Sequence, residues 1–423
     1  MIRILPSSDI GRLLSRRSAR MTEAEALVRP ILDDVRKRGD KAVAEYARRF
    51  DNLEGDSLEI SPDAMRKVKL PAAMRSALRT AAANIRSYAR LQMPEPKAVT
   101  PAPGLRLTQI IRPLDCVAAY IPSGRYPLPS TLMMTVIPAR VAGVRTVCAT
   151  SPRPADAILG TAAFLKVDHL YRIGGAHAIA AFAFGTKTIP RADRIVGPGS
   201  IWVAAAKKII AGETGIDFVA GPTEILIIAD KGDASWIAAD MLAQAEHDTD
   251  SSAILLTRSK KLALEVARHI EAQLETLPTA DVARVAIRRN SAIVLVDSPA
   301  EAVDLCNRFA PEHLSLHDRT LLPGIRHSGS VFLGPYSTEA AGDYASGPNH
   351  VLPTSGIARL RGGLSAADFV KVISVQQLSP GALSRLTPAV TTLARAEGLE
   401  AHARSVEIRS RPIPAKARKT PNA

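Results

Sequence analysis

Gln244 and His247 are the first two residues whose types and spacing could do chemistry. They lie three residues apart near the end of a predicted helix over residues 234–247, so their side chains share one helix face. An amide oxygen and an imidazole on one face could bind a single metal ion. Polar residues near a helix end are also common on protein surfaces, so the spacing alone leaves both interpretations open.

Glu312 and His313 form a second candidate pair, directly after Pro311. Pro311 favours an extended Ala310 and cannot donate a hydrogen bond in a strand ladder, which predicts that the pair lies where a loop becomes a strand. Both side chains could then reach a cleft at a sheet edge, where a carboxylate beside an imidazole provides two proton acceptors near neutral pH. The alternative is an exposed pair at the start of a strand.

Two glycine turns precede predicted helices, one at Gly174-Gly175 and one at Gly197-Pro198-Gly199. Backbone N–H groups at a helix N-terminus can bind a phosphate, although such turns are also glycine-rich without any ligand. The dinucleotide motif GxGxxG and the phosphate-loop motif GxxxxGK[ST] are both absent from the sequence. The turns therefore leave a phosphate site and a purely structural role both open.

A polar segment over residues 337–354, STEAAGDYASGPNHVLPT, has little apolar periodicity. Long polar segments of this kind are often functional. Its chemically active side chains include Glu339, Asp343, Asn349 and His350. Further on, Glu397 and His402 lie five residues apart on the predicted last helix.

The elements that must position these residues form two series of short apolar runs that alternate with helical stretches. This alternation predicts βαβ units and parallel sheets, that is, two α/β domains with helical ends. The predicted strands are 116–121, 146–149, 169–173, 194–196 and 216–219, then 225–229, 253–257, 292–296, 313–316 and 330–333. The predicted helices between them are 131–142, 155–165, 176–184 and 200–211, then 234–247, 261–274, 299–309 and 320–327.

The two ends of the chain are predicted to be helical. Helices are expected over residues 21–50 and 72–91, followed by a proline-rich loop over 94–103. After Asn349 no further strand is predicted, and helices are expected over 365–372 and 388–405.

Composition narrows the function classes. The chain has 423 residues with 46% hydrophobic and 23% charged residues, which excludes wholesale disorder. No apolar run is long enough for a membrane helix, and three cysteines are too few for a disulfide framework. The net charge of +14 could attract nucleic acid, but the charge is spread out and no nucleic-acid-binding motif accompanies it. We therefore expect a cytoplasmic protein that binds neither nucleic acid nor membrane.

The N-terminus allows two interpretations. Residues 1–20 hold five arginines, several serines and one acid, which is the composition of a transit peptide. The alternative, which we favour, is an arm that precedes the first helix.

Taken together, several segments resemble the histidinol dehydrogenases, a family of zinc- and NAD-dependent enzymes. The similarity runs in the family's order over about residues 20–407. The matching segments are YIPSGRYPLPSTLMMTVIPARVAGV, GPGSIWVAAAK, AGPTEILIIAD, QAEHDTDS, APEHL, SGSVFLG with GDYASGPNHVLPT, and AEGLEAH.

The resemblance implies a metal site and a shared active site. One Zn²⁺ per subunit would be bound by Gln244, His247, Asp343 and His402, and His402 would come from the partner subunit of a homodimer. L-Histidinol would contact the zinc ligands and four other residues, namely Thr223, Glu312, His313 and Glu397.

The resemblance also implies the reaction, in which NAD accepts hydride twice and L-histidinol becomes L-histidine through L-histidinal. His313 would be the base for the alcohol step, and Glu312 would activate the water that hydrates the aldehyde. Residues expected to contact NAD are Tyr120, His177 and Ser200. The cofactor side departs from the family pattern, which has Gln at His177, Asn at Ser200 and Gly at Ser123. Arg361-Gly362-Gly363 likewise replaces a more aromatic stretch.

The fold implied is α/β, with two incomplete Rossmann-like parallel-sheet domains, an N-terminal helical arm and a C-terminal helical segment exchanged in the dimer. The expected divisions are an arm at 1–21, a first domain at 22–119 plus 225–364 that carries the zinc site, a second domain at 120–224 on the NAD side, and a C-terminal segment at 365–423.

Three other functions fit part of this pattern. A dehydrogenase of the same scaffold could oxidise another small polar alcohol, such as a sulfonated diol, with Arg125 serving the anion; Glu397 and His402 favour histidinol instead. A non-catalytic anion-binding relative would not need four intact zinc ligands. A zinc hydrolase using Glu312 would leave the match at Tyr120 unexplained.

Overall fold

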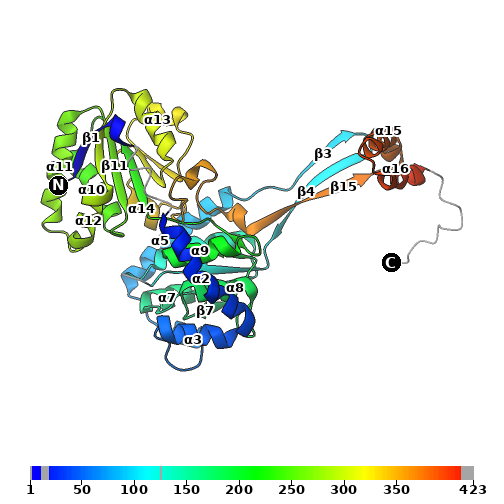
Figure 1. Ribbon diagram of the computed structural model, residues 1–423, viewed down its shortest axis with the longest axis horizontal. Helices are drawn as coiled ribbons and strands as arrows, with labels where there is room; N and C mark the ends of the chain where they lie inside the picture. The colour runs from blue at the N-terminus through cyan, green and yellow to red at the C-terminus, as the bar shows by residue number, and fades with distance from the viewer. Residues whose placement is uncertain (1, 11–18, 124–125, 411–423) are drawn as a thin grey trace. The chain divides into compact units, whose positions relative to one another are not determined.

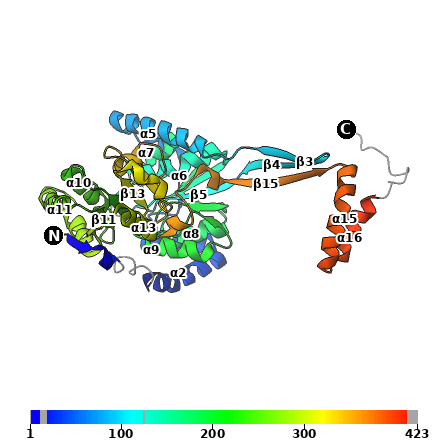
Figure 2. The ribbon, with the colours of Figure 1, turned by 90° about the horizontal axis from the view of Figure 1, so that it is seen from above.

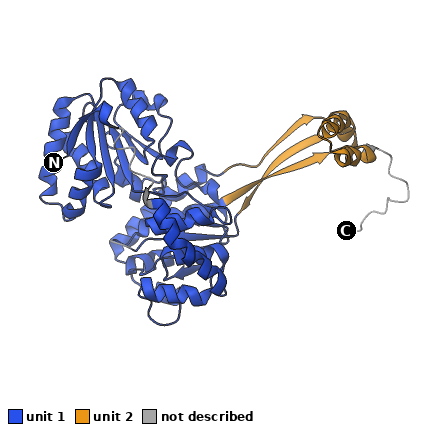
Figure 3. Ribbon diagram, in the orientation of Figure 1, with its two compact units in different colours: residues 1–93, 114–369 blue, residues 94–113, 370–423 orange. Residues whose placement is uncertain are grey.

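The computed structural model describes residues 2–10, 19–123 and 126–410. The chain divides into two compact units: unit 1 consists of Met1–Met93 and Leu114–Phe369, and unit 2 consists of Pro94–Pro113 and Val370–Ala423 (Figure 3). Unit 1 contains two parallel sheets, called here the metal-side sheet and the cofactor-side sheet after the residues predicted on each. Both have the βαβ connections that the sequence predicts (Figure 1).

The metal-side sheet has the strand order β1-β12-β11-β10-β13-β14, all parallel. Ile225 and Ile227 of β10 face α10, α11 and α12, whereas Leu226 and Ile228 face α13. Both sheet faces are therefore covered, which explains why the strand sequence is continuously apolar. The strands are β1 (Arg3–Pro6), β10 (Glu224–Ile228), β11 (Ser252–Thr257), β12 (Ala292–Leu295), β13 (His313–Leu316) and β14 (Ser330–Leu333). The helices are α10 (Ala234–Ala245), α11 (Lys260–Leu274), α12 (Ala280–Asn290) and α13 (Pro299–Phe309).

The cofactor-side sheet has the order β2-β7-β6-β5-β8-β9, with only the edge pair β2 and β7 antiparallel among the described strands. Helices α5, α6 and α7 cover one face, and α2, α8 and α9 cover the other (Figure 2). Its strands are β2 (Glu59–Ile60), β5 (Cys116–Tyr120), β6 (Thr146–Thr150), β7 (His169–Tyr171), β8 (Arg194–Val196) and β9 (Gly215–Ile216). Its helices are α2 (Ala19–Arg38), α3 (Asp40–Phe50), α4 (Pro62–Lys67), α5 (Ala72–Leu91), α6 (Pro129–Ala142), α7 (Asp156–Leu165), α8 (Gly175–Phe184) and α9 (Ile201–Ile210).

The expected grouping of residues 22–119 with 225–364 differs from this packing. Val28, Leu32 and Val35 lie on one face of α2 and join the core of the cofactor-side sheet, and β2 pairs with β7. The amphipathic pattern predicted a buried helix face without identifying the sheet that it covers. The expected arm over residues 1–21 also differs, because β1 is an edge strand of the metal-side sheet and α2 begins at Ala19.

Unit 2 contains an antiparallel sheet in the order β15-β4-β3, followed by two helices. The predicted loop over 94–103 is wrong, because β3 occupies most of it, and the register shifts between Val99 and Ala102 around Pro101. The predicted helix over 365–372 is also wrong beyond Phe369, where β15 begins and pairs with β4. The elements are β3 (Lys97–Ala102), β4 (Leu105–Pro113), β15 (Val370–Leu378), α15 (Pro380–Ala396) and α16 (Glu400–Glu407).

Four other predictions of local structure need correction. The strand predicted over 216–219 is β9 over Gly215–Ile216, and the helix predicted over 234–247 ends at Ala245, before His247. The helix predicted over 388–405 is two helices, so Glu397 and His402 do not share one helix. The predicted helix over 320–327 is a 3₁₀ helix over Arg319–Gly324. Among the helices in the described residues, none is long and apolar enough to cross a membrane.

Candidate active site

The amino ends of β10 and β13 carry one cluster of polar side chains. These strands are neighbours, with Ile225 opposite His313, so Thr223 and Glu312 precede them at the same edge of the sheet. Helix α10 runs back toward that edge, and its C-terminal turn brings Gln244 there. The short helix α14 (Glu339–Tyr344) completes the cluster.

Ala310 turns the chain from α13 into this edge in a way that the sequence did not predict. Its backbone is left-handed, with φ 52° and ψ 65°, rather than extended. Its N–H donates to Cys306 O at 2.7 Å, so it ends α13 in the way a C-terminal glycine commonly does. The predicted position of the pair is confirmed, because β13 begins at His313 immediately after Glu312.

Glu312 is buried and held by two hydrogen bonds. Its Oε2 accepts from the Thr223 hydroxyl at 2.5 Å and from the Glu224 N–H at 2.9 Å. Burial raises the pKa of Glu312, and the favourable effects of His313 and of the two hydrogen bonds only partly offset it. Glu312 is thus a fixed carboxyl group with enhanced basicity.

His313 is buried with one ring nitrogen in use. Its Nδ1 lies 3.2 Å from Glu224 O, and since a carbonyl only accepts, Nδ1 carries the hydrogen. Its Nε2 has no hydrogen-bond partner in the described part of the chain and lies 3.6 Å from Asp343 Oδ1. Burial opposes protonation, but Glu339, Glu312 and Asp343 together raise the pKa of His313 well above its ordinary value. Nε2 is therefore the ring nitrogen that a ligand or substrate could contact, and the surrounding carboxylates favour its protonated form.

His247, Glu339 and Asp343 could hold a metal ion, because one ligand atom from each lies within 4.8 Å of the others. The Gln244 amide lies between the Thr223 hydroxyl, at 2.8 Å, and the two Glu339 oxygens, at 2.6 and 3.2 Å. Carboxylate, imidazole and amide groups are donors that zinc accepts. The residues present in unit 1 therefore fit a divalent metal.

Glu339 belongs to the cluster, although sequence reasoning gave it no role beyond its place in the polar segment over residues 337–354. It is buried, its Oε1 lies 3.6 Å from His313 Nδ1, and burial raises its pKa to about 8. The available signal was its spacing of four residues from Asp343, which places both on one face of α14. The Thr338 side chain caps this helix, accepting from the Ala341 N–H.

The predicted NAD residues lie at the carboxyl end of the cofactor-side sheet. Tyr120 ends β5, His177 is in the first turn of α8, and Ser200 is the exposed N-cap of α9. The connections from neighbouring β5 and β8 lead in opposite directions, and such a switch point is where open α/β sheets bind ligands. The Tyr120 hydroxyl accepts from the Gly175 N–H at 3.0 Å.

His177 is buried and already paired. Its Nε2 lies 2.7 Å from Asp51 Oδ2, and the same oxygen accepts from the Gly174 N–H at 2.9 Å. The Nε2–H therefore donates to Asp51. His177 cannot use this nitrogen to donate to NAD, which is the contact expected at the position where the family pattern has Gln. His177 instead holds the turn that begins α8.

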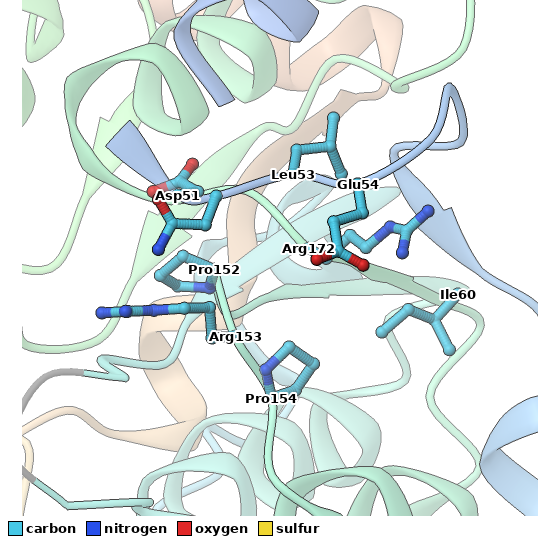
Figure 4. Close-up of a pocket in the computed structure, with 9 residues that line it drawn as sticks. Asp51, Leu53, Glu54, Ile60, Pro152, Arg153, Pro154 and Arg172 are labelled. Carbon is cyan, nitrogen blue, oxygen red and sulfur yellow. The ribbon is translucent and has the colours of Figure 1, made fainter. Parts of the chain in front are cut away.

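A cavity of about 350 Å³ adjoins this turn. Asp51 and Glu54 line one wall, and Pro152 and Arg153 line the wall that faces it (Figure 4). Arg172, which directly follows β7, contributes a second guanidinium. The cavity therefore places two guanidinium groups and two carboxylates at the carboxyl ends of β6 and β7.

Two predicted site residues belong to unit 2. Glu397 is the C-cap of α15, and His402 is on α16; both are exposed.

Ser123 is one of the residues that differ from the family pattern. Its Oγ is buried without a hydrogen-bond partner in the described residues. Arg125 lies outside the described residues.

Replacing Gly197 with alanine should disturb the turn between β8 and α9. Gly197 has φ 112°, and a Cβ at this position would overlap the Tyr120 carbonyl oxygen. We expect a loss of about 1–3 kcal/mol in unfolding free energy and weaker NAD binding. Urea unfolding and cofactor titration measure these effects. The control is Gly212→Ala, since no atom lies within 4 Å of a Cβ there, and equal effects of both substitutions would contradict the prediction.

Known proteins are similar to this chain in sequence and in fold. The histidinol dehydrogenase family profile matches residues 14–410. The chain is 46% identical to histidinol dehydrogenase of Geobacillus kaustophilus over 92% of this chain and 94% of that protein. It is 44% identical to that of Methanothermobacter thermautotrophicus, over 95% and 97%. A crystal structure of histidinol dehydrogenase from Elizabethkingia anophelis superposes with a TM-score of 0.92 at 34% identity, covering 96% of this chain and 98% of that one. The chain belongs to the histidinol dehydrogenase family.

Proposed function

We propose that this chain is an oxidoreductase that converts L-histidinol to L-histidine through L-histidinal, with zinc and NAD, as the last steps of histidine synthesis. The observation that carries the proposal is the buried pair Glu312 and His313 beside the cluster of His247, Glu339 and Asp343, with the Gln244 amide in contact with Glu339. Membership of the family supplies the substrate. Two oxidations at one carbon need a base for the alcohol and a base for water, and the pair provides both.

Zinc is the proposed metal, held by Gln244, His247 and Asp343 with His402 as the fourth ligand. Hard oxygen and nitrogen donors with a single carboxylate ligand leave the ion a net positive charge. When bound, it would orient and polarise the substrate. We infer that Glu339 supports this centre by contacting the Gln244 amide.

His313 takes the proton of the substrate alcohol on Nε2. Its Nδ1–H bond to Glu224 O keeps Nε2 free of hydrogen and fixes the ring. The carboxylates that raise the pKa of His313 include the metal ligand Asp343. If the charge of Asp343 were shared with a cation, Asp343 would raise the pKa of His313 less. The pKa would then lie nearer its ordinary range, where neutral imidazole accepts a proton.

Glu312 activates the water that hydrates the aldehyde. Both hydrogen bonds that hold the carboxylate go to Oε2, from Thr223 and the Glu224 N–H, which leaves Oε1 to take the proton of water. Thr223 also contacts Gln244, so it connects this base to the metal centre.

NAD is the proposed hydride acceptor in both oxidations, at the switch point of the cofactor-side sheet. Tyr120 and Ser200 flank that point, and the cavity with Arg153 and Arg172 lies at the next strands along the sheet, β6 and β7. Guanidinium groups at the carboxyl ends of parallel strands suit the anionic part of a dinucleotide.

A cytoplasmic homodimer with shared active sites is proposed as the working form. Unit 2 buries small residues such as Ala382, Ala394 and Ala403. In contrast, Val372 is 54% exposed and Leu393 is 64% exposed. Apolar exposure on such an extended unit is typical of an interface, and it supports a partner subunit that receives Glu397 and His402.

Zinc-loaded protein should form NADH from histidinol and from histidinal. We expect a chelator to abolish turnover of both compounds and added zinc to restore it, measured by absorbance of NADH with metal content determined in parallel. Apo protein treated with magnesium is the control. No turnover of either compound by protein with one bound zinc per subunit would overturn the proposed function.

A further inference from the structure

The residues that follow Asp343 are bonded to helices that pack on the cofactor-side sheet. Asn84 of α5 donates from Nδ2 to Ala345 O at 2.8 Å. Gly347 has φ 121°, and a Cβ there would lie 2.9 Å from Asn84 O, so only glycine allows this close approach. We call residues 345–350 the link segment.

The Asn349 side chain anchors the link segment to α6. It is buried, its Nδ2 donates to Met134 O at 2.6 Å, and its Oδ1 accepts from the Val351 N–H at 2.9 Å. In an α-helix, Met134 O would accept from the N–H of residue 138, but Pro138 has no N–H. The Asn349 amide therefore takes the place of a helical hydrogen bond that α6 cannot make.

His350 connects the same helix to Asp343. Its Nδ1 lies 2.7 Å from Asp343 O, so Nδ1 carries the hydrogen, and its Nε2 accepts from the Thr131 hydroxyl at 3.2 Å. Thr131 and Met134 are three residues apart and share one face of α6. Asn349 and His350 thus bind one helix face together, and His350 continues to the backbone of Asp343.

We propose that Asn349 is a positioning residue for the metal ligand Asp343, acting through the carbonyl that Pro138 leaves free. The inference rests on the proposed zinc-binding role of Asp343. A buried carbonyl without its helical donor is a strong acceptor for one amide, because leaving it unsatisfied is unfavourable. The bond holds the link segment on α6, and the His350 bond holds Asp343 in turn. Since α6 follows the strand that ends in Tyr120, the same contact connects the metal and cofactor sides of unit 1.

The variant that tests this is Asn349→Asp, which keeps the size and the acceptor for Val351 but removes the donor to Met134. We expect its zinc dissociation constant to rise about tenfold or more in competition with a chromophoric chelator. Asn307→Asp is the matched control, because Asn307 also donates to a carbonyl, Gly324 O at 2.9 Å, and accepts from a backbone N–H. Its zinc affinity should stay within about twofold. An unchanged zinc affinity in Asn349→Asp would overturn the inference.

Pro138→Ala provides a second test that buries no charge and so remains informative if Asn349→Asp unfolds. The substitution restores a backbone N–H that competes with Asn349 for Met134 O, so Pro138→Ala should also weaken zinc binding. Adding Asn349→Asp to the Pro138→Ala variant should then raise the zinc dissociation constant by less than about threefold more, because the two substitutions remove the same interaction. If the two substitutions weaken zinc binding by fully additive amounts, the role given to Pro138 is wrong. Failure of the wild-type chain to bind zinc would defeat the proposed function as well, whereas equally tight binding by wild type and both variants defeats only this inference.

Discussion

His313→Gln is expected to lower kcat for histidinol by about 10²–10⁴-fold, the usual contribution of a general base. Glutamine can still donate to Glu224 O, as His313 Nδ1 does at 3.2 Å, but it provides no basic nitrogen at the position of Nε2. Because His313 is not among the proposed zinc ligands, the zinc content should stay near that of the wild type. Stopped-flow measurement of the first NADH formed, with metal analysis of the same sample, tests both statements.

The matched control is Glu312→Gln, which keeps an acceptor for Thr223 and Glu224 and removes the base for water. It should form the first NADH at a near-normal rate and then accumulate the aldehyde, so the NADH yield per histidinol falls from two toward one. Normal formation of the first NADH by His313→Gln would contradict the role given to Nε2. A full yield with Glu312→Gln would contradict the role given to Glu312.

The parallel sheets could be predicted because their strands are buried on both faces. β10 reads EILII, and each of its residues is buried, so the local sequence carries the whole signal. The sheet of unit 2 could not be predicted in this way. β15 is exposed along most of its length and pairs with β4, far away in the sequence, so neither strand shows the apolar run of a core strand.

The site was predictable to the extent that its residues are adjacent or only three positions apart in the sequence. Gln244 with His247 and Glu312 with His313 are such pairs, and their chemistry follows from residue type. His177 shows what spacing cannot reveal, since Asp51, its partner, is 126 residues away. The same holds for Asn349, whose acceptor Met134 O lacks a helical donor because Pro138 lies in the same helix, α6. Pairings over such distances depend on tertiary packing, for which a single sequence has no local signal.

Mixing two inactive variants, His313→Gln and His402→Ala, is expected to restore activity. If each site combines unit 1 of one subunit with His402 of the other, a hybrid dimer contains one site with both residues intact. Random reassociation makes about half of the dimers hybrid, each with one working site of two, so recovery should approach about one quarter of wild-type activity.

The physical basis of this expectation is the candidate metal cluster of unit 1. Within the described residues, unit 1 gathers His247, Asp343 and the Gln244 amide together with Glu339, whereas His402 is an exposed imidazole on unit 2. A tetrahedral zinc site has four ligands. If Glu339 stays hydrogen-bonded to Gln244, unit 1 provides Gln244, His247 and Asp343, and one further neutral donor is needed. The control mixture is His313→Gln with Asp343→Asn, in which both changes lie on unit 1 and no hybrid site is complete, so activity should not return. Recovery in the control, or its absence in the first mixture despite confirmed hybrid dimers, would show that each subunit builds its site alone.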